Sequence, residues 1–345
     1  MLKKLISAGG ALVLGLALLT GCSSDQSKET SAKKLDKVTL AEVTHSVFYA
    51  PQYVAMNKGF FEDEGIKIDI INTDGADKTM AALLSGEAQV GLMGPEASIY
   101  VHQSNKNNYS VVFAQLTKRD GSFLMSRNAY PNFTYNDMKG AEVLGGRKGG
   151  MPEMTFEYVL KQQGLKLGKD KAKGEVNVRT DVAYGVMAGA FAGGEADFTT
   201  VFEPTATTME KDGQGYIVAS IGKDSGEIPY TAYATTRSYL NGNKDLIQRF
   251  TNATYKGQLW VQKESAENIA TEIQPYFNDI SHDDLVSVVN RYKSIDAWSS
   301  DPVLKEESLN RLVSVMKEAG ELEGSVSYKD IVNVDFAENA IKNIK

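Results

Sequence analysis

Loops that follow predicted strands carry side chains suited to holding a small organic molecule. Aromatic rings offer flat apolar faces, carboxylates attract ammonium or amidine groups, and guanidinium groups attract anions. Ligands of open parallel sheets bind beyond the carboxyl ends of the strands, so we predict that these loops meet at one site. The candidate ligand-binding residues are His45, Ser46, Phe48, Tyr49, Asp74, Glu96, Thr117, Arg119, Arg147, Gly150, Met151, Tyr184, Glu203 and Tyr230.

The acidic candidates and Phe48 also have a purely structural interpretation. Asp74 or the nearby Asp77 could cap a helix that starts there. Glu96 and Glu203 could each complement the dipole at the start of a helix. Phe48 could equally be a core residue. The sequence leaves both interpretations open at each of these positions.

A glycine-rich segment, Gly145–Glu153, precedes a predicted helix. Pro152 suits the first helical position, and free backbone N–H groups at a helix start attract anions. Arg147 and Lys148 add positive charge. No Gly-Lys-Ser/Thr closes the segment and its glycine spacing is not that of a dinucleotide fingerprint, so it matches neither nucleotide motif. The alternative is a flexible turn with solvated basic side chains.

The composition argues against catalysis and against nucleic-acid binding. The chain has 3 histidines and 1 cysteine, and it contains neither a nucleophile elbow nor an HExxH motif. His45 has no second metal ligand at a recognisable spacing, so we expect no metal and no cofactor. The formal charge is −7, from 37 basic and 44 acidic residues. The chain therefore lacks the excess of basic residues that is typical of a nucleic-acid-binding protein. We therefore expect a binding protein without enzymatic activity.

The first residues have the pattern of a targeting segment. Lys3 and Lys4 precede a mostly apolar run over residues 5–19. A transmembrane helix needs about 20 predominantly apolar residues, and this run is interrupted by serine and glycine. A charged start followed by a short apolar run is typical of a secretory signal.

The cysteine lies directly after this run, in Leu19-Thr20-Gly21-Cys22, which resembles a bacterial lipobox. That resemblance implies cleavage before Cys22 and a lipid on its thiol, which would hold the chain at a membrane surface. The alternative is a plain signal peptide with an incidental cysteine. We predict a signal peptide over residues 1–21 and a polar, flexible, lipidated tether over residues 22–37.

Strand patterns alternate with helix patterns through the first two thirds of the chain. Strands are predicted at residues 38–43, 66–71, 90–93, 109–116, 122–126, 142–144, 176–178, 197–201, 216–220 and 230–236. Helices are predicted within 45–64 and at 77–85, 154–163, 184–192, 244–263, 266–277, 282–295 and 302–319. This alternation predicts an α/β fold with mostly parallel sheets flanked by helices.

The pattern of the first half returns in the second. Residues 80–88 read as a helix ending in Gly-Glu-Ala, followed by a strand and Gly94-Pro95-Glu96. Residues 187–196 repeat this order, and Phe202-Glu203-Pro204 follows the next strand. Glycine after a helix is a common cap, so part of the match is generic. The acidic residue beside proline after both strands favours two similar halves.

Several segments together resemble ABC-transporter solute-binding proteins of the nitrate/sulfonate/taurine and thiamine-pyrimidine group. The matching segments are His45–Ala55, Lys58–Ile66, Leu84–Gly91, Phe202-Glu203-Pro204 and Gly226–Thr231. The resemblance covers most of residues 38–240. It implies a two-lobed periplasmic-binding-protein-like fold of type II, with two hinge crossings. Residues 38–120 and 235–345 would form lobe 1, and residues 121–234 would form lobe 2.

The resemblance also implies a function and partners. A small solute would bind between the lobes, and closure would signal an ABC permease and its ATPase. The chain would be extracytoplasmic, held to the bacterial cell membrane at Cys22, and monomeric. Hinge closure around a ligand is an established mode of switching.

The mixture of aromatic and acidic residues in the candidate loops favours a nitrogen-bearing organic ligand. A thiamine-like pyrimidine or an aminosulfonate such as taurine fits this mixture, and nitrate fits it poorly. Thiamine-pyrimidine synthases resemble this group too, but the cysteine-rich iron motif of those enzymes is absent here. The remaining alternative is an anchored adhesin or sensor that binds a macromolecule, which predicts an exposed patch instead of a cleft.

Overall fold

Two five-stranded sheets form the framework of the chain. The computed structural model describes residues 34–104 and 109–344. The first sheet has the strand order β2-β1-β3-β10-β4. Its strands are β1 (Asp36–Glu42), β2 (Ile66–Asn72), β3 (Val90–Met93), β4 (Ser110–Thr117) and β10 (Thr231–Thr236). β1 runs parallel to β2 and β3, and β10 runs antiparallel to its neighbours β3 and β4.

The second sheet repeats this arrangement with the order β7-β6-β8-β5-β9. Its strands are β5 (Ser122–Ser126), β6 (Glu142–Leu144), β7 (Asn177–Arg179), β8 (Phe198–Phe202) and β9 (Tyr216–Ser220). β6 runs parallel to β7 and β8, and β5 runs antiparallel to β8 and β9. In each sheet, four strands therefore point one way and a single inserted strand points the other.

The ten predicted strands are all present, with ends that differ by at most two residues. The prediction of mostly parallel sheets is confirmed with one refinement, because β10 and β5 are antiparallel to their neighbours. β1 begins at Asp36, so the last two residues of the predicted tether belong to the sheet. Residues 1–33, which include the predicted signal peptide, Cys22 and the tether up to residue 33, lie outside the described residues.

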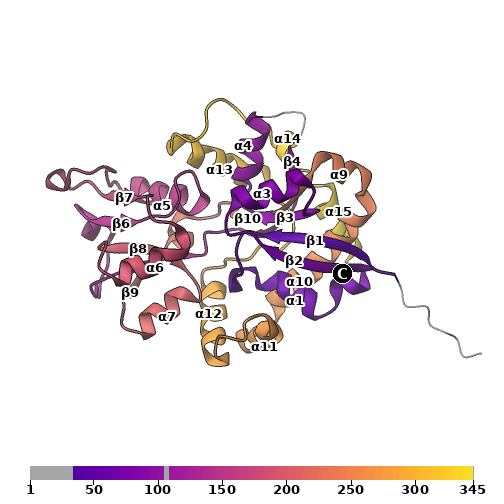
Figure 1. The fold of residues 1–345 in the computed structure, drawn as a ribbon, viewed down its shortest axis with the longest axis horizontal. Coiled ribbons are helices and arrows are strands. Elements are labelled where there is room, and N and C mark those ends of the chain that lie inside the picture. The colour runs from indigo at the N-terminus through magenta and orange to yellow at the C-terminus, as the bar shows by residue number, and fades with distance from the viewer. Residues whose placement is uncertain (1–33, 105–108, 345) are drawn as a thin grey trace, which may run out of the picture. The chain divides into compact units, whose positions relative to one another are not determined.

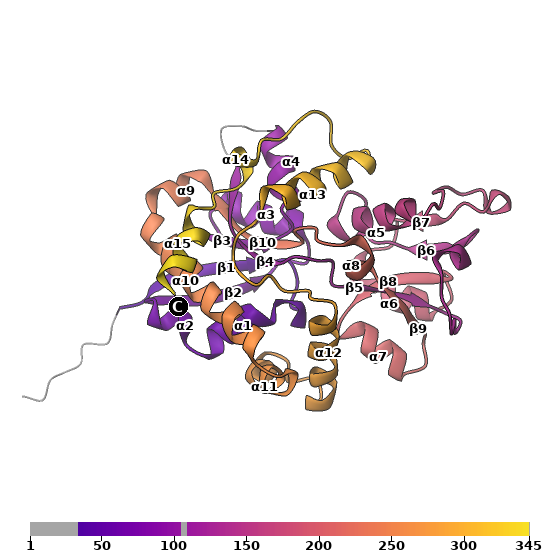
Figure 2. The same ribbon diagram turned by 180° about the vertical axis from the view of Figure 1, so that it is seen from behind.

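Helices cover the faces of both sheets (Figures 1 and 2). Those of the second sheet are α5 (Met151–Gln162), α6 (Tyr184–Ala192), α7 (Thr205–Lys211) and α8 (Ile221–Ser225). The others are α1 (Ala50–Asn57), α2 (Phe60–Asp63), α3 (Ala76–Ser85), α4 (Glu96–Ser104), α9 (Arg237–Gly242), α10 (Lys244–Lys263), α11 (Ala266–Ile273), α12 (His282–Ser294), α13 (Glu306–Glu318), α14 (Tyr328–Ile331) and α15 (Asp335–Asn343).

Two of these helices follow directly after the repeated proline motifs; they are not among the predicted helix ranges, although a helix start at these motifs was one of the two open interpretations. α4 follows Pro95 and α7 follows Pro204, so each Pro/Glu loop is the start of a helix. The helix expected from Pro302 begins at Glu306 instead. The Asp301 side chain accepts a hydrogen bond from Val303 N at 2.9 Å, which forms a turn before the helix. Side-chain bonds of this kind compete with helical backbone bonds.

The long helix α10 packs against α1 at a point where only glycine fits. A Cβ atom on Gly257 would lie 2.3 Å from the carbonyl oxygen of Pro51. The buried face of α10 includes Ile247, Phe250 and Val261, which recur at helical spacing. This contact anchors the C-terminal helices on the first sheet.

The chain passes between the two sheets twice, once between β4 and β5 and once between β9 and β10. Residues 35–345 form one compact unit that includes both sheets. The predicted lobe boundaries at residues 120 and 234 stay a prediction. Within the described residues, no helix is long and apolar enough to cross a membrane.

A buried carboxylate at the end of β1 joins several elements of the first sheet. Glu42 is fully buried and accepts hydrogen bonds from Gln52 Nε2 and Tyr53 Oη, each at 2.9 Å. His45 Nδ1 lies 2.9 Å from the other carboxylate oxygen. Gln52 Oε1 in turn accepts a bond from Tyr233 on β10 at 3.0 Å. The network connects β1, α1 and β10 beneath the loop that follows β1.

We predict that Glu42→Ala destabilises the chain by about 2 to 6 kcal/mol. The change leaves Gln52 Nε2 without its acceptor and leaves Tyr53 Oη only His45 Nδ1, 3.0 Å away, and each lost bond to the carboxylate costs ~1–3 kcal/mol. Urea unfolding of the variant measures the loss. The control Glu87→Ala removes an exposed carboxylate and should change stability by less than about 0.5 kcal/mol. A loss below about 1 kcal/mol for Glu42→Ala would show that the network is not stabilising.

Candidate functional site

A cavity of about 560 Å³ opens where the loops of both sheets meet. Its walls come from the segments that follow the parallel strands β1, β2, β3, β6 and β7, from the last residue of β8, and from the start of β10. The lining residues are Val43, Thr44, Ser46, Phe48, Tyr49, Asp74, Gly75, Ala76, Lys78, Gly94, Glu96, Gly146, Arg147, Gly150, Met151, Pro152, Ala183, Tyr184, Gly185, Phe202, Tyr230 and Thr231. Ten of the fourteen predicted site residues are among them.

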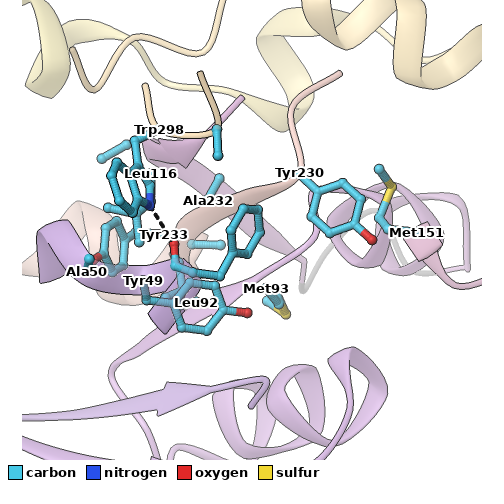
Figure 3. Close-up of a cluster of buried hydrophobic side chains, with 14 of the residues drawn as sticks. Tyr49, Ala50, Leu92, Met93, Leu116, Met151, Tyr230, Ala232, Tyr233 and Trp298 are labelled. Carbon is cyan, nitrogen blue, oxygen red and sulfur yellow. Dashed lines mark hydrogen bonds between the residues drawn. The ribbon is translucent and has the colours of Figure 1, made fainter. Parts of the chain in front are cut away.

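The loop after β1 contributes both a polar and an aromatic part of the wall. Ser46 caps a single 3₁₀ turn over Val47–Tyr49 and accepts a bond from Phe48 N at 3.2 Å. This turn places Phe48 and Tyr49 in the wall, and both are almost completely buried. Trp298 Nε1 donates to the Phe48 carbonyl at 2.9 Å, the bond drawn in Figure 3, and fixes the turn from behind. Phe48 is thus a core residue and a lining residue together.

Four aromatic rings form a continuous face on one side of the cavity. Phe48 lies 5.8 Å from both Phe202 and Tyr230, measured between ring centroids. Phe202 lies 6.0 Å from Tyr230 and 5.9 Å from Tyr184. Figure 3 shows the Tyr230 ring beside Met151 at the start of α5. These flat apolar surfaces suit a planar or apolar ligand body, since aromatic rings pair at such distances.

Glu96 brings a buried carboxyl to the cavity. It is the first residue of α4 and only 2% exposed, and its Oε2 has no hydrogen-bond partner among the described residues. A Cβ atom on Gly94 would lie 1.9 Å from that oxygen, so the carboxyl occupies space that only glycine leaves free. Burial raises the pKa of Glu96 to about 7, although the nearby Arg147 charge opposes the rise.

The glycine-rich segment forms a further part of the wall. Gly146 has a φ of +92°, a left-handed conformation that favours glycine. Gly150 precedes α5, and Met151 and Pro152 are the first two residues of that helix. Arg147 is exposed and lines the cavity. Tyr100 of α4 donates to the Gly149 carbonyl at 3.0 Å and joins this segment to the first sheet.

The start of α3 supplies the remaining polar lining. Asp74 has a φ of +54° and an exposed side chain, and it does not cap the helix. Because Asp74, Gly75 and Ala76 all line the cavity, the unpaired N–H groups of the first turn of α3 lie at its edge. The first helical turns of α3, α4 and α5 thus all border one cavity.

Comparison with known proteins agrees with this arrangement. A family model described as NMT1/THI5 like matches residues 47–267. YtlA of Bacillus subtilis (strain 168), named as a candidate binding protein, is 40% identical over 337 residues, which is 98% of each chain. The chain belongs to the NMT1/THI5-like family.

Solved structures show that this family member has a fold found in solute-binding proteins. The alkanesulfonate-binding protein SsuA from Xanthomonas axonopodis pv. citri, bound to MOPS, matches with a TM-score of 0.67 at 13% identity, over 86% of this chain and 98% of that one. The nitrate-binding protein NrtA from Synechocystis PCC 6803 matches with a TM-score of 0.68 at 16% identity, over 90% of each chain. The predicted family resemblance and two-lobed periplasmic-binding-protein-like fold are confirmed.

Glu203, a predicted ligand contact of this NMT1/THI5-like chain, lies outside the cavity lining. Its buried carboxylate accepts bonds from Thr207 N at 2.9 Å and Thr207 Oγ1 at 3.0 Å. Arg291 Nη1 of α12 lies 2.5 Å from the same carboxylate. The charge is therefore balanced within the protein, and it joins the start of α7 to α12.

His45, Thr117 and Arg119 also lie outside this lining. His45 contacts Glu42 and Tyr276, and the bond to Glu42 raises its pKa. Thr117 is buried at the end of β4 and shares a hydrogen bond of 2.6 Å with Thr231. Arg119 lines a separate, smaller cavity. Position after a strand placed these residues near the site but did not decide where their side chains point.

The sequence analysis missed several lining residues of the NMT1/THI5-like site. Phe202 is the last residue of β8, Thr44 stands in a loop that was already under consideration, and Lys78 stands in the first turn of α3. Phe202 belongs to Phe202-Glu203-Pro204, the segment already singled out after the predicted strand 197–201, so taking every residue of that segment as a candidate would have found it. Among residues 34–104 and 109–344, no group of three or more histidine, cysteine or acidic side chains is placed to hold a metal ion.

We predict that Glu96→Gln stabilises the unliganded chain at pH 8 but has little effect at pH 5. The folded chain holds this proton up to a pKa of about 7, above the ordinary value of 4.5. Folding of the wild type therefore loses stability as the pH rises from about 4.5 to 7, and glutamine removes that loss. Urea unfolding at both pH values should give a gain of about 2 to 3 kcal/mol at pH 8. An equal gain at both pH values would contradict the assignment, and Glu87→Gln serves as an exposed control.

Proposed function

We propose that this chain is a lipid-anchored, extracytoplasmic solute-binding protein that delivers a small organic solute to an ABC importer. The family membership and the fold support the binding role. The observation that carries the proposal is the buried carboxyl of Glu96, whose Oε2 has no hydrogen-bond partner among the described residues, in a cavity whose loops come from both sheets. Such a group is costly unless a ligand completes its hydrogen bonds.

The favoured ligand carries a basic nitrogen on a flat or apolar body. The rings of Phe48, Phe202 and Tyr230 offer the apolar face. Glu96 would accept a hydrogen bond from an amino or amidine nitrogen of the ligand. Arg147 and the N–H groups at the start of α5 would bind an acidic or polar substituent. A thiamine-like pyrimidine or an aminosulfonate meets these requirements. The bare nitrate ion would leave both the aromatic face and Glu96 unused.

The alternatives have weaker support. An adhesin or sensor for macromolecules would use an exposed surface, whereas the aromatic candidates lie in the walls of a cavity. A thiamine-pyrimidine-synthase-like enzyme would need catalytic groups, and no histidine or cysteine lines the cavity in the described part of the chain. We propose that the protein acts as a monomer and that the lobes, 38–120 with 235–345 and 121–234, close around the solute.

The first test is a thermal-shift screen followed by calorimetry. The chain from Ser23 onward retains the compact unit of residues 35–345 and would be screened against pyrimidines, sulfonates, amino acids and oxyanions. A ligand at 100 times its dissociation constant should stabilise the fold by ~2.7 kcal/mol. Tight nitrate binding without any organic ligand would overturn the ligand class. No shift with any small molecule would count against the transport role.

We predict that Glu96→Gln weakens the ligand found in this screen roughly tenfold to a hundredfold. A hydrogen bond to a charged group contributes about 1.5 to 3 kcal/mol. Tyr184→Ala should also weaken binding, and its side chain is 43% exposed, so the fold should tolerate the change. The control His45→Gln alters a residue outside the lining. Calorimetry that gives equal affinities for Glu96→Gln and the wild type would exclude Glu96 from the contact.

We also predict that Cys22→Ser releases the protein from the membrane. The thiol is the atom that the lipid would occupy, and acyl chains are what would hold the chain to the bilayer. In cells that express each form, the wild type should sediment with membranes and partition into detergent. The serine variant should appear in the soluble or secreted fraction. Membrane association that survives the substitution would contradict anchoring at this residue.

A further inference from the structure

A second cavity, of about 330 Å³, shares no lining residue with the first. It is lined by Arg119, Gly226, Glu227, Glu307, Ser308 and Arg311. Arg119 belongs to the passage between β4 and β5, and Gly226 and Glu227 belong to the passage between β9 and β10. The other three residues lie in the first two turns of α13. Both passages between the sheets and one C-terminal helix therefore meet at this cavity.

Arg119 brings an unpaired guanidinium group to the cavity. Its Nε atom is buried and has no hydrogen-bond partner in the described part of the chain, and no described carboxylate forms an ion pair with it. The adjacent Asp120 is not placed to fill this role: its Oδ1 accepts from Ser122 N at 2.6 Å, and its buried Oδ2 has no hydrogen-bond partner among the described residues, Arg119 included. A buried donor of this kind is costly to leave without a partner.

Arg311 places a second guanidinium group in the same cavity. Its Nη1 donates to the Glu227 carbonyl at 3.0 Å, which is a neutral acceptor. A Cβ atom on Gly226 would lie 3.3 Å from this nitrogen, so glycine allows the close approach. Within the described residues, no carboxylate is within ion-pair distance of Arg311.

The two carboxylates of the cavity do not neutralise these arginines. Glu227 lies 3.8 Å from Lys118 Nζ, which also pairs with Asp296 at 2.7 Å. Glu307 is exposed at the start of α13. Guanidinium groups bind carboxylates and phosphates through paired, charge-assisted bonds, so two unneutralised guanidinium groups in one cavity favour an anion.

We propose that this second cavity binds a small anion that carries a carboxylate or phosphate group. Arg119 and Arg311 hold the anion, and the buried Ser308 side chain lies beside it. The volume admits a metabolite larger than a bare oxyanion. An anion held here bridges both passages between the sheets and α13, whatever solute the first cavity takes.

The test uses inorganic phosphate and citrate as probes on the chain from Ser23 onward. Calorimetry at constant ionic strength should show saturable binding of at least one probe, and the tighter probe assigns the anion class. Arg311→Gln should weaken that binding roughly tenfold to a hundredfold. This side chain is exposed, so the variant should fold. Glu307→Gln should tighten binding, by up to about fivefold, because it removes a like charge from the cavity wall.

The variant Arg147→Gln distinguishes anion binding at this second cavity from anion binding at the first one. If the anion binds at the glycine-rich segment instead, Arg147→Gln will weaken it and Arg311→Gln will not, which would overturn the proposal. Crystals soaked in selenate provide a direct readout, with an anomalous peak expected between Arg119 and Arg311. A peak elsewhere, or affinities that are equal in all three variants, would also overturn it. These outcomes do not depend on the organic ligand of the first cavity.

Discussion

The common direction of four strands in each sheet is the constraint on which the site depends. Side chains beyond the carboxyl ends of parallel strands meet at one edge, and nearly the whole lining of the large cavity comes from such positions. The inserted strands β10 and β5 run against their neighbours and connect the chain to the other sheet. One cavity can therefore take walls from residues more than a hundred positions apart.

The repeated Pro/Glu motif shows how one local pattern can serve two purposes. Glu96 and Glu203 both follow the central strand of their sheet, and both are buried. Glu203 meets Arg291 of α12, so its charge is balanced within the fold. Oε2 of Glu96 has no hydrogen-bond partner in the described part of the chain, and burial raises the pKa of this carboxyl to about 7. The helix packed against the second motif accounts for the difference.

The two cavities are physically connected through the same backbone segment. The passage between β9 and β10 carries Gly226 into the small cavity and Tyr230 into the large one. The passage between β4 and β5 also contacts both cavities. Arg119 lines the small cavity, and Gly121 packs against Phe48, a lining residue of the large one, so closely that a Cβ atom on Gly121 would lie 2.6 Å from the Phe48 ring. Each passage thus has residues that contact the small cavity and residues that contact the lining of the large one.

The sequence by itself determined the strands, most of the long helices and the loops that form the site. Strand patterns and helix caps are local, because they depend on residues a few positions apart. The lining loops after β1, β2, β3 and β6 were accordingly identified in advance. The family resemblance rested on the same local segments.

Only the tertiary structure decided which side chains of those loops face the cavity. His45 and Glu203 stand in the expected loops, yet Glu42 and Arg291 engage them elsewhere. Arg119 turned out to line a cavity of its own, together with α13. These outcomes depend on partners far away in the chain. A buried charge takes whichever partner the packing brings within reach, and local sequence carries no record of that partner.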